Sequence, residues 1–161
     1  MQSTMMRLTC VASLFAALAV GQVPRGQGYV FQGLGSTSYD HGIALGQTGA
    51  GGEGVFWKGL GVGGDLGAVY PYRSLESVVG IANVSGVYHF TAGRSDTKWD
   101  PFVVGGYTLL FRGGTANGFH WGGGFGYWFH RHIGARVEFR DQRTRRGDFS
   151  FPMVRFGISF R

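Results

Sequence analysis

The 161-residue chain is poor in charge, in proline and in cysteine. Charged residues make up 15% of it, well below the roughly 25% of an average soluble domain, which argues against an ordinary water-facing globule. Four prolines and no strict three-residue glycine period exclude a collagen-like chain. No stretch reaches the run of about 18 apolar residues that a spanning helix needs, so a helical membrane protein is also excluded.

The one cysteine, Cys10, lies in an apolar run over 8–20 that follows a basic residue and ends in small residues. These are the features of a cleaved signal peptide. We therefore expect residues 1–21 to be removed and residues 22–161 to form one mature domain. A buried amino-terminal helix is the alternative interpretation. Without Cys10, the mature chain holds no disulfide and no thiolate metal site.

Glycine is abundant, with 31 positions, and aromatic residues make up 16% of the chain. Rings at this density bury themselves, which excludes disorder. After the leader, apolar residues alternate with small or polar ones, as in strands with two unlike faces. Most of these stretches approach the nine to eleven or so residues with which a tilted strand crosses a bilayer. We predict strands over 28–36, 50–57, 60–70, 78–90, 102–112, 118–129, 133–141 and 149–160.

The two faces of the last strand differ most clearly. Its apolar positions are Val154, Phe156, Ile158 and Phe160, and between them stand Arg155, Gly157, Ser159 and Arg161. Pro152 marks a change of parity, for which we expect a β-bulge. Elsewhere the second face is mainly glycine with scattered charges, which suits a narrow polar interior and an apolar exterior in lipid. A soluble secreted β-barrel that binds a small apolar ligand is the alternative.

The connections and the aromatic residues support a membrane orientation. Short turns at 58–59 and 130–132 alternate with longer polar connections, although the connection at 94–101 breaks this rule. Aromatic residues fall near both ends of the strands, as in an interfacial girdle, with core packing as the alternative. They are Trp57, Phe90, Trp99, Phe102 and Phe129 near the short turns, and Tyr39, Tyr70, Tyr72, Phe111, Phe119 and Phe149 near the other end.

The chain resembles the small OmpA-type and OmpX-type outer-membrane barrels in its glycine and aromatic stretch 122–129 and its closing strand 154–160. The resemblance implies an all-β fold, an eight-stranded antiparallel up-and-down transmembrane β-barrel in the bacterial outer membrane. It also implies a final aromatic residue that the barrel-assembly machinery recognises, and Phe160 resembles it, although Arg161 follows. We expect a monomer with a structural or surface-interaction role, no catalysis and no cofactor.

An outer-membrane lipid-modifying enzyme is a further alternative. Lipid A deacylases resemble this chain in size, but the serine that their active-site pattern places two residues after a histidine is missing after His120. Ser85 and His89 share a face but lie about 13 Å apart along a strand, beyond hydrogen-bond reach. His130 and His132 flank a turn without a neighbouring carboxylate or thiol, so no metal site is expected.

Basic residues are concentrated near the end of the chain, where 131–161 holds eight arginines against three acidic residues. A net charge of +6 would be compatible with binding to nucleic-acid phosphates. Because the chain is expected to be exported and its strands carry alternating phenylalanines, we do not expect nucleic acid as a partner. Guanidinium groups pair bidentately with phosphate. We therefore predict that Arg143, Arg145 and Arg146 contact the phosphates of outer-membrane lipid and lipopolysaccharide. A solvated basic loop without bound lipid is the alternative.

Five further charged residues lie at inward positions of the predicted strands. They are Asp65, Arg136, Glu138, Arg140 and Arg155, together with the polar Asn83 and His120. Eight strands leave an interior that side chains fill, and an uncompensated buried charge costs about 3 to 5 kcal/mol. We therefore predict that Glu138 bridges Arg136 or Arg155 and that this ionic network plugs the lumen. A water-filled bore is the alternative.

Overall fold

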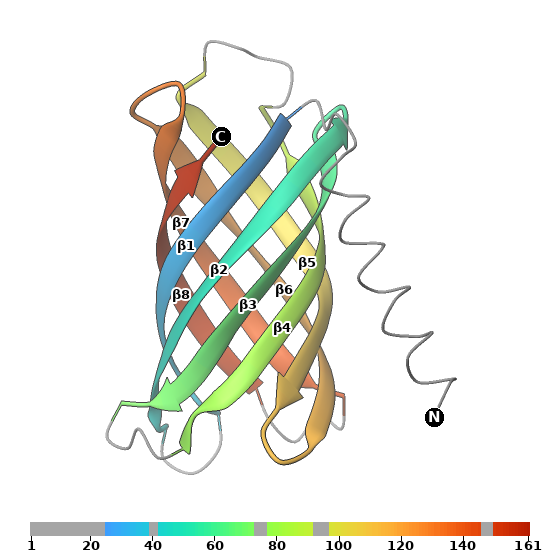
Figure 1. Ribbon diagram of the computed structural model, residues 1–161, viewed down its shortest axis with the longest axis vertical. Coiled ribbons are helices and arrows are strands. Elements are labelled where there is room, and N and C mark those ends of the chain that lie inside the picture. Colours follow the sequence, from blue (N-terminus) through green and yellow to red (C-terminus); the bar gives the residue numbers. More distant parts are fainter. Residues whose placement is uncertain (1–24, 39–41, 73–76, 92–96, 146–149) are drawn as a thin grey trace, which may run out of the picture.

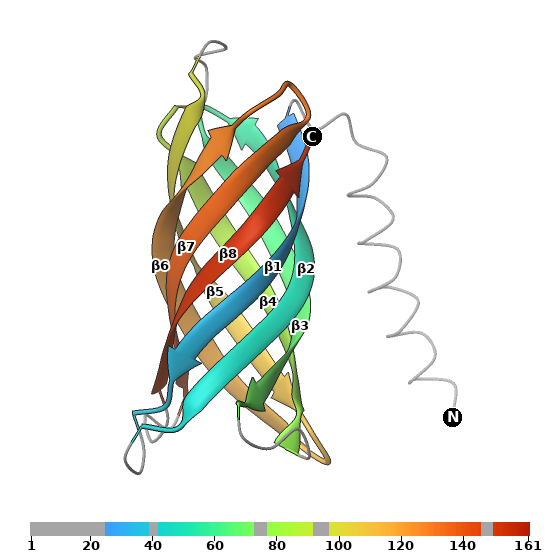
Figure 2. The ribbon, with the colours of Figure 1, turned by 90° about the vertical axis from the view of Figure 1, so that its left-hand side faces the viewer.

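The structure is a computed structural model that describes residues 25–38, 42–72, 77–91, 97–145 and 150–161. Eight antiparallel strands follow one another around a closed barrel, and β8 pairs with β1 (Figures 1 and 2). The strands are β1 (Arg25–Ser36), β2 (Ala44–Trp57), β3 (Leu60–Pro71), β4 (Val79–His89), β5 (Trp99–Phe111), β6 (Thr115–Trp128), β7 (Ile133–Thr144) and β8 (Ser150–Phe160). The predicted all-β, up-and-down barrel is confirmed.

The expected leader over 1–21 lies outside the residues that the structure describes. Within the part of the chain that the structure describes, no helix is long and apolar enough to cross a membrane.

Some strands are longer than the alternation indicated. β2 begins at Ala44, six residues before the predicted start, because its ladder with β1 continues to the pair Ser36 and Ala44. β7 continues to Thr144, which pairs with Gly118 of β6. Arg143 therefore belongs to a strand rather than to the last loop.

The expected β-bulge at Pro152 is absent from the described ladder. β7 and β8 pair in continuous register through Asp141 and Pro152, with Arg140 opposite Met153. Met153 and Arg155 both point inward and are buried. The change near Pro152 is therefore one of interior chemistry, from apolar to charged, and the parity of the strand stays the same.

The barrel is apolar outside and charged inside. Large apolar side chains of every strand are exposed on its outer wall, including Val30, Leu66, Val84, Val103, Phe125, Phe139, Phe156 and Ile158. The inward positions between them carry the buried polar and ionic groups. In water this arrangement would expose a continuous apolar surface, whereas in lipid it places each surface in its preferred medium.

Aromatic rings are exposed near both ends of the barrel. Trp57, Phe90, Trp99 and Phe129 are exposed at the end that also holds the C-terminus, and Tyr72, Phe111 and Phe119 at the other. We call these the terminus end and the loop end. The prediction that Phe102 belongs to the outer aromatic girdle is wrong, because its side chain is 2% exposed and faces the lumen. Tyr39 and Phe149 lie outside the described residues.

Glycines on the inward face of β6 leave space for the charged side chains of the interior. A Cβ added at Gly122 would lie 2.2 Å from the carbonyl oxygen of Phe139, and one at Gly124 would lie 2.1 Å from that of Val137. Neither position accepts a side chain without a shift of the neighbouring backbone, so the inward face of β6 carries no side chains between His120 and Trp128. Long side chains from other strands fill the space over it.

Candidate functional site: an ionic network in the lumen

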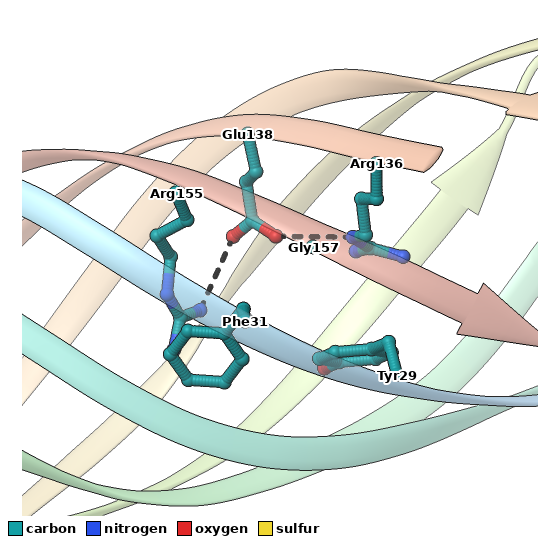
Figure 3. A pocket seen from close by; sticks show the side chains of 6 residues that line it. All are labelled: Tyr29, Phe31, Arg136, Glu138, Arg155 and Gly157. Carbon is teal, nitrogen blue, oxygen red and sulfur yellow. Dashed lines mark hydrogen bonds and ion pairs between the residues drawn. The ribbon is translucent and has the colours of Figure 1, made fainter. Parts of the chain in front are cut away.

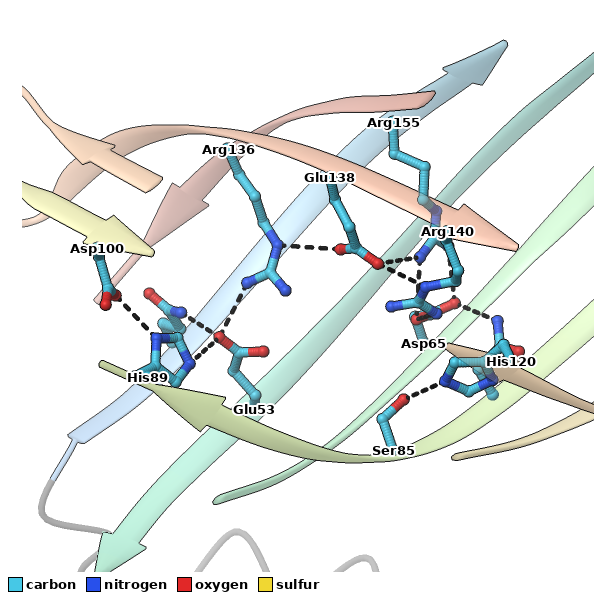
Figure 4. A network of polar contacts seen from close by, with 12 residues as sticks. Glu53, Asp65, Ser85, His89, Asp100, His120, Arg136, Glu138, Arg140 and Arg155 are labelled. Carbon is cyan, nitrogen blue, oxygen red and sulfur yellow. Dashed lines mark hydrogen bonds and ion pairs between the residues drawn. The ribbon is translucent and has the colours of Figure 1, made fainter. Parts of the chain in front are cut away.

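The centre of the lumen holds two carboxylates between arginines (Figure 4). Asp65 of β3 binds Arg140 of β7 and Arg155 of β8, with each N–O distance 2.9 Å. Glu138 of β7 lies 2.5 Å from Nε of Arg140 and 3.5 Å from Nη1 of Arg155. All four side chains are at most 2% exposed. These contacts join β3 to β7 and β8 across the barrel interior.

The network continues toward the terminus end through Arg136. Its Nε lies 3.3 Å from Glu138, and its Nη1 lies 2.9 Å from Glu53 of β2. Glu53 in turn lies 2.9 Å from Nε2 of His89, whose Nδ1 lies 2.9 Å from Asp100. Because each ring nitrogen of His89 faces a carboxylate oxygen, the doubly protonated imidazolium suits this geometry. The interior then balances four carboxylates with three arginines and one histidine.

A chain of neutral groups extends the network from Asp65. Asn83 Nδ2 donates to Asp65 at 2.7 Å, and Thr108 donates to the Asn83 carbonyl oxygen at 2.7 Å. Both ring nitrogens of His120 are occupied, Nδ1 by Thr108 and Nε2 by the Ser85 hydroxyl, each at 2.9 Å. Sequence spacing did not indicate the contact between Ser85 and His120, because the two residues lie on strands that are not neighbours.

Aromatic rings flank the arginines of the network. The guanidinium carbon of Arg136 lies 3.8 Å from the ring centre of Phe102, and that of Arg155 lies 3.6 Å from the ring centre of Phe31. Phe31, Arg136 and Arg155 line a small pocket beside Glu138, together with Tyr29 and Gly157, with room for about one water molecule (Figure 3). Cation–π contacts and ion pairs therefore hold the same guanidinium groups.

The loop end of the lumen holds a cluster of apolar side chains. Leu45, Val69, Ile81, Phe151 and Met153 form one buried cluster, with exposed fractions from 0 to 7%. The amides of Gln47 and Gln142, both fully buried, have no hydrogen-bond partner among the described residues. The lumen thus changes from ionic groups to apolar packing along its axis.

The structure brings all five residues of the sequence-predicted network together. It adds Glu53, His89 and Asp100, which the sequence analysis left out. The register of β2 and β3, in which Gly51 pairs with Asp65, places Glu53 on the same inward face, but glycines on both sides of Glu53 left no sequence signal for it. Asp100 was not predicted to face the lumen, because the neighbouring Pro101 indicated a loop rather than a strand.

The other predicted site residues lie on the outer surface. Arg143 binds Asp141 at 2.8 Å and remains half exposed, and Arg145 is exposed just after β7. Arg146 lies outside the described residues. Phe160 is exposed at the end of β8 and pairs with Gly28 of β1, so it lies at the seam that closes the barrel.

Comparison with known proteins shows which solved structures share this fold. No family model matches the chain, and no curated protein matches it. Among solved structures, Neisserial surface protein A has a TM-score of 0.68 at 12% identity, over 84% of this chain and 96% of that one. The N-terminal β-barrel domain of Pseudomonas aeruginosa OprF has a TM-score of 0.60 at 16% identity, over 84% and 98%. Ail, the attachment invasion locus protein of Yersinia pestis, has a TM-score of 0.60 at 10% identity, over 84% and 96%.

These likenesses define a class by its fold. The chain has the eight-stranded fold of the small outer-membrane β-barrels, the OmpA and OmpX type to which the sequence pattern pointed. The alignments span nearly the full length of those barrels.

Proposed function

We propose that this protein is a monomeric barrel of the bacterial outer membrane, closed to ions, with a structural or surface-interaction role. The distribution of charge carries this proposal. Every carboxylate side chain of the described residues is paired, and all of them but the half-buried Asp100 are buried, whereas the outer wall is built from apolar side chains. A ligand-binding soluble barrel would need the opposite arrangement, with a polar exterior and an apolar cavity.

A plugged lumen follows from the same contacts. Three arginines cross the interior and are fixed by ion pairs at 2.5 to 3.5 Å, and an apolar cluster fills the loop end. For an ion to pass, several of these buried pairs would have to break at once, each at a cost of several kcal/mol (about 3 to 5). We therefore propose that the barrel has no stable open state.

Membrane fractionation and planar-bilayer recording test these two statements. We expect the protein to fractionate with the outer membrane, to require detergent for extraction and to change gel mobility on heating. A protein that extracts into buffer without detergent would contradict the membrane assignment. In planar bilayers we expect no steady conductance, and a steady channel of porin size would contradict the plug while leaving the location intact.

The surface role is proposed for the loop end. Arg143 and Arg145 are exposed beside the outward-facing Tyr107, Asn117 and Phe119. A guanidinium group next to an aromatic rim suits the phosphates of a glycolipid such as lipopolysaccharide. Replacing Arg143 and Arg145 by glutamine should lower co-purification of lipopolysaccharide. Unchanged retention would favour a merely solvated basic rim.

We propose no catalytic role. Ser85 and His120 form a hydrogen-bonded pair of the kind that activates a nucleophile, which is the observation in favour of a lipid-modifying enzyme. In a catalytic arrangement a carboxylate orients the histidine, but Nδ1 of His120 contacts the Thr108 hydroxyl. Both members of the pair are also buried, at 6% and 2% exposure, which supports a structural hydrogen bond.

A further inference from the structure

Four cationic residues surround the terminus end of the barrel, each one or two residues from an exposed aromatic ring in the sequence. Lys58 follows Trp57 in the hairpin after β2, and Lys98 precedes Trp99 at the start of β5. Arg131 follows Phe129 in the turn after β6, and Arg161 follows Phe160 at the end of β8. We call these eight residues the terminus-end rim. Its cations stand at four separate places around the closed barrel.

The cations of this rim are exposed and held close to the barrel. Lys58 Nζ lies 5.6 Å from the centre of the Trp57 ring, and the Lys58–Gly59 hairpin fixes that position. The hairpin needs positive φ at both residues, 41° at Lys58 and 99° at Gly59, as in a tight two-residue turn. Arg161 donates from Nε to the backbone carbonyl oxygen of Arg131 at 2.8 Å, and its guanidinium carbon lies 4.0 Å from the centre of the Trp128 ring, so this cation is held against the end of the barrel.

The acidic side chains at this end of the barrel point into the lumen, away from the rim. Glu53 and Asp100 are the acidic residues near the rim in the described part of the chain, and both turn into the lumen to flank His89. Thr91 also donates to Asp100, at 2.7 Å. Among the side chains of the described residues, the rim therefore presents cations without a carboxylate beside them, and the one carboxylate at its surface is that of the terminal residue, Arg161.

The aromatic neighbours identify the level of the membrane at which these charges lie. Exposed tryptophan and phenylalanine rings at a barrel end mark the interface between hydrocarbon and headgroups. A lysine or arginine one or two residues away then reaches the phosphate level with its long side chain. Each such cation contributes roughly 1 kcal/mol of attraction to an anionic membrane surface.

We propose that the terminus-end rim binds the phosphate groups of anionic phospholipids in the leaflet that surrounds it. The inference rests on the proposed membrane location and adds a lipid preference to it. It concerns the opposite end of the barrel from the arginines discussed for lipopolysaccharide. The ligand class is a lipid phosphodiester with net negative charge, such as phosphatidylglycerol.

Tryptophan fluorescence offers a local measurement. Trp57 and Trp99 stand in the rim, whereas Trp121 is exposed nearer the loop end and Trp128 is buried. In a Trp121→Phe background, the protein is placed in bilayers that contain brominated phosphatidylglycerol or brominated phosphatidylcholine, whose acyl chains quench nearby rings. The ratio of the two quenching curves gives the relative affinity for the anionic lipid.

We expect phosphatidylglycerol to be preferred several-fold, about fivefold for one strong contact, and the preference to fall in high salt. The quadruple variant Lys58→Gln, Lys98→Gln, Arg131→Gln and Arg161→Gln should remove it. The control Arg112→Gln removes an exposed charge at the loop end and should leave the quenching ratio unchanged. Equal quenching by the two lipids in the parent protein would overturn the inference.

Two further readouts separate the possible failures. Folding of the quadruple variant in neutral bilayers is checked by its heat-modifiable mobility, so a loss of lipid preference is not mistaken for a loss of the barrel. If the parent chain fails to form a heat-modifiable barrel in any bilayer, the membrane assignment itself fails. If the rim instead sediments with purified peptidoglycan in a charge-dependent way and shows no lipid preference, its partner is an acidic peptide and the lipid proposal is wrong.

Discussion

Replacing Glu138 by alanine should test the ionic network most directly. This carboxylate contacts three arginines, with N–O distances of 2.5 Å to Arg140, 3.3 Å to Arg136 and 3.5 Å to Arg155. Its side chain is 2% exposed, so solvent screens these three ion pairs very little. Breaking a buried ion pair by removing one partner costs about 3 to 5 kcal/mol, because the remaining charge is left uncompensated.

The contacts that remain set the expected value within this range. Arg140 and Arg155 each keep Asp65 at 2.9 Å. Arg136 keeps Glu53 at 2.9 Å. Since every arginine retains one carboxylate, the loss should lie near the lower end, at about 3 kcal/mol of the free energy of unfolding.

Urea unfolding in phospholipid vesicles, followed by the gel mobility of folded and unfolded protein, measures this loss as a shift of the midpoint. Glu138→Gln keeps the shape but not the charge and should show most of the effect. Val137→Ala, at the adjacent outward position, should cost no more than about 1 kcal/mol. If Glu138→Ala unfolds at the same urea concentration as Val137→Ala, the reasoning that assigns stability to this network is refuted.

Three other changes probe separate parts of the barrel. Gln142→Leu should be neutral or stabilise the barrel by about 1 to 3 kcal/mol in the same unfolding assay, because it removes a buried amide with no described hydrogen-bond partner; a clear loss would show that the amide is bonded. Phe160→Ala should lower the amount of folded barrel in outer membranes while deletion of Arg161 leaves it unchanged, and normal insertion of the Phe160 variant would remove its role in assembly. Ser85 should resist labelling by a fluorophosphonate probe in the folded barrel, and efficient labelling that depends on His120 would revive the enzyme alternative.

The alternation of residues along single strands predicted much of the site. β7 shows Arg136, Glu138 and Arg140 at every second position between apolar residues, so their common face follows from the two-residue period of a strand. Asp65 stands in β3 on the face opposite Leu66 in the same way. Where large apolar and charged residues alternate, the inward side is therefore readable from the sequence.

The same reasoning fails where glycine occupies both faces. Glu53 is flanked by Gly52 and Gly54, and Gly51 precedes them, so neither parity of this segment carries an apolar signature. The contact of Ser85 with His120 has a different cause, because it spans the interior from β4 to β6 across β5. Such a contact depends on the curvature of the closed barrel, which spacing along one strand does not contain.

The ionic network is also expected to favour the observed register of the strands over a slipped one. A slip of β7 by one residue would turn its three inward charges outward, since the side-chain period of a strand is two. Each arginine placed at the middle of the lipid face would cost roughly 2 to 4 kcal/mol, and Asp65 on β3 would lose Arg140. The apolar residues of β7 would at the same time enter a lumen built to hold charge. Pairing of Arg136 and Arg140 with carboxylates from β2 and β3, on strands far from β7 in the closed sheet, thus penalises the slipped barrel from both of its faces.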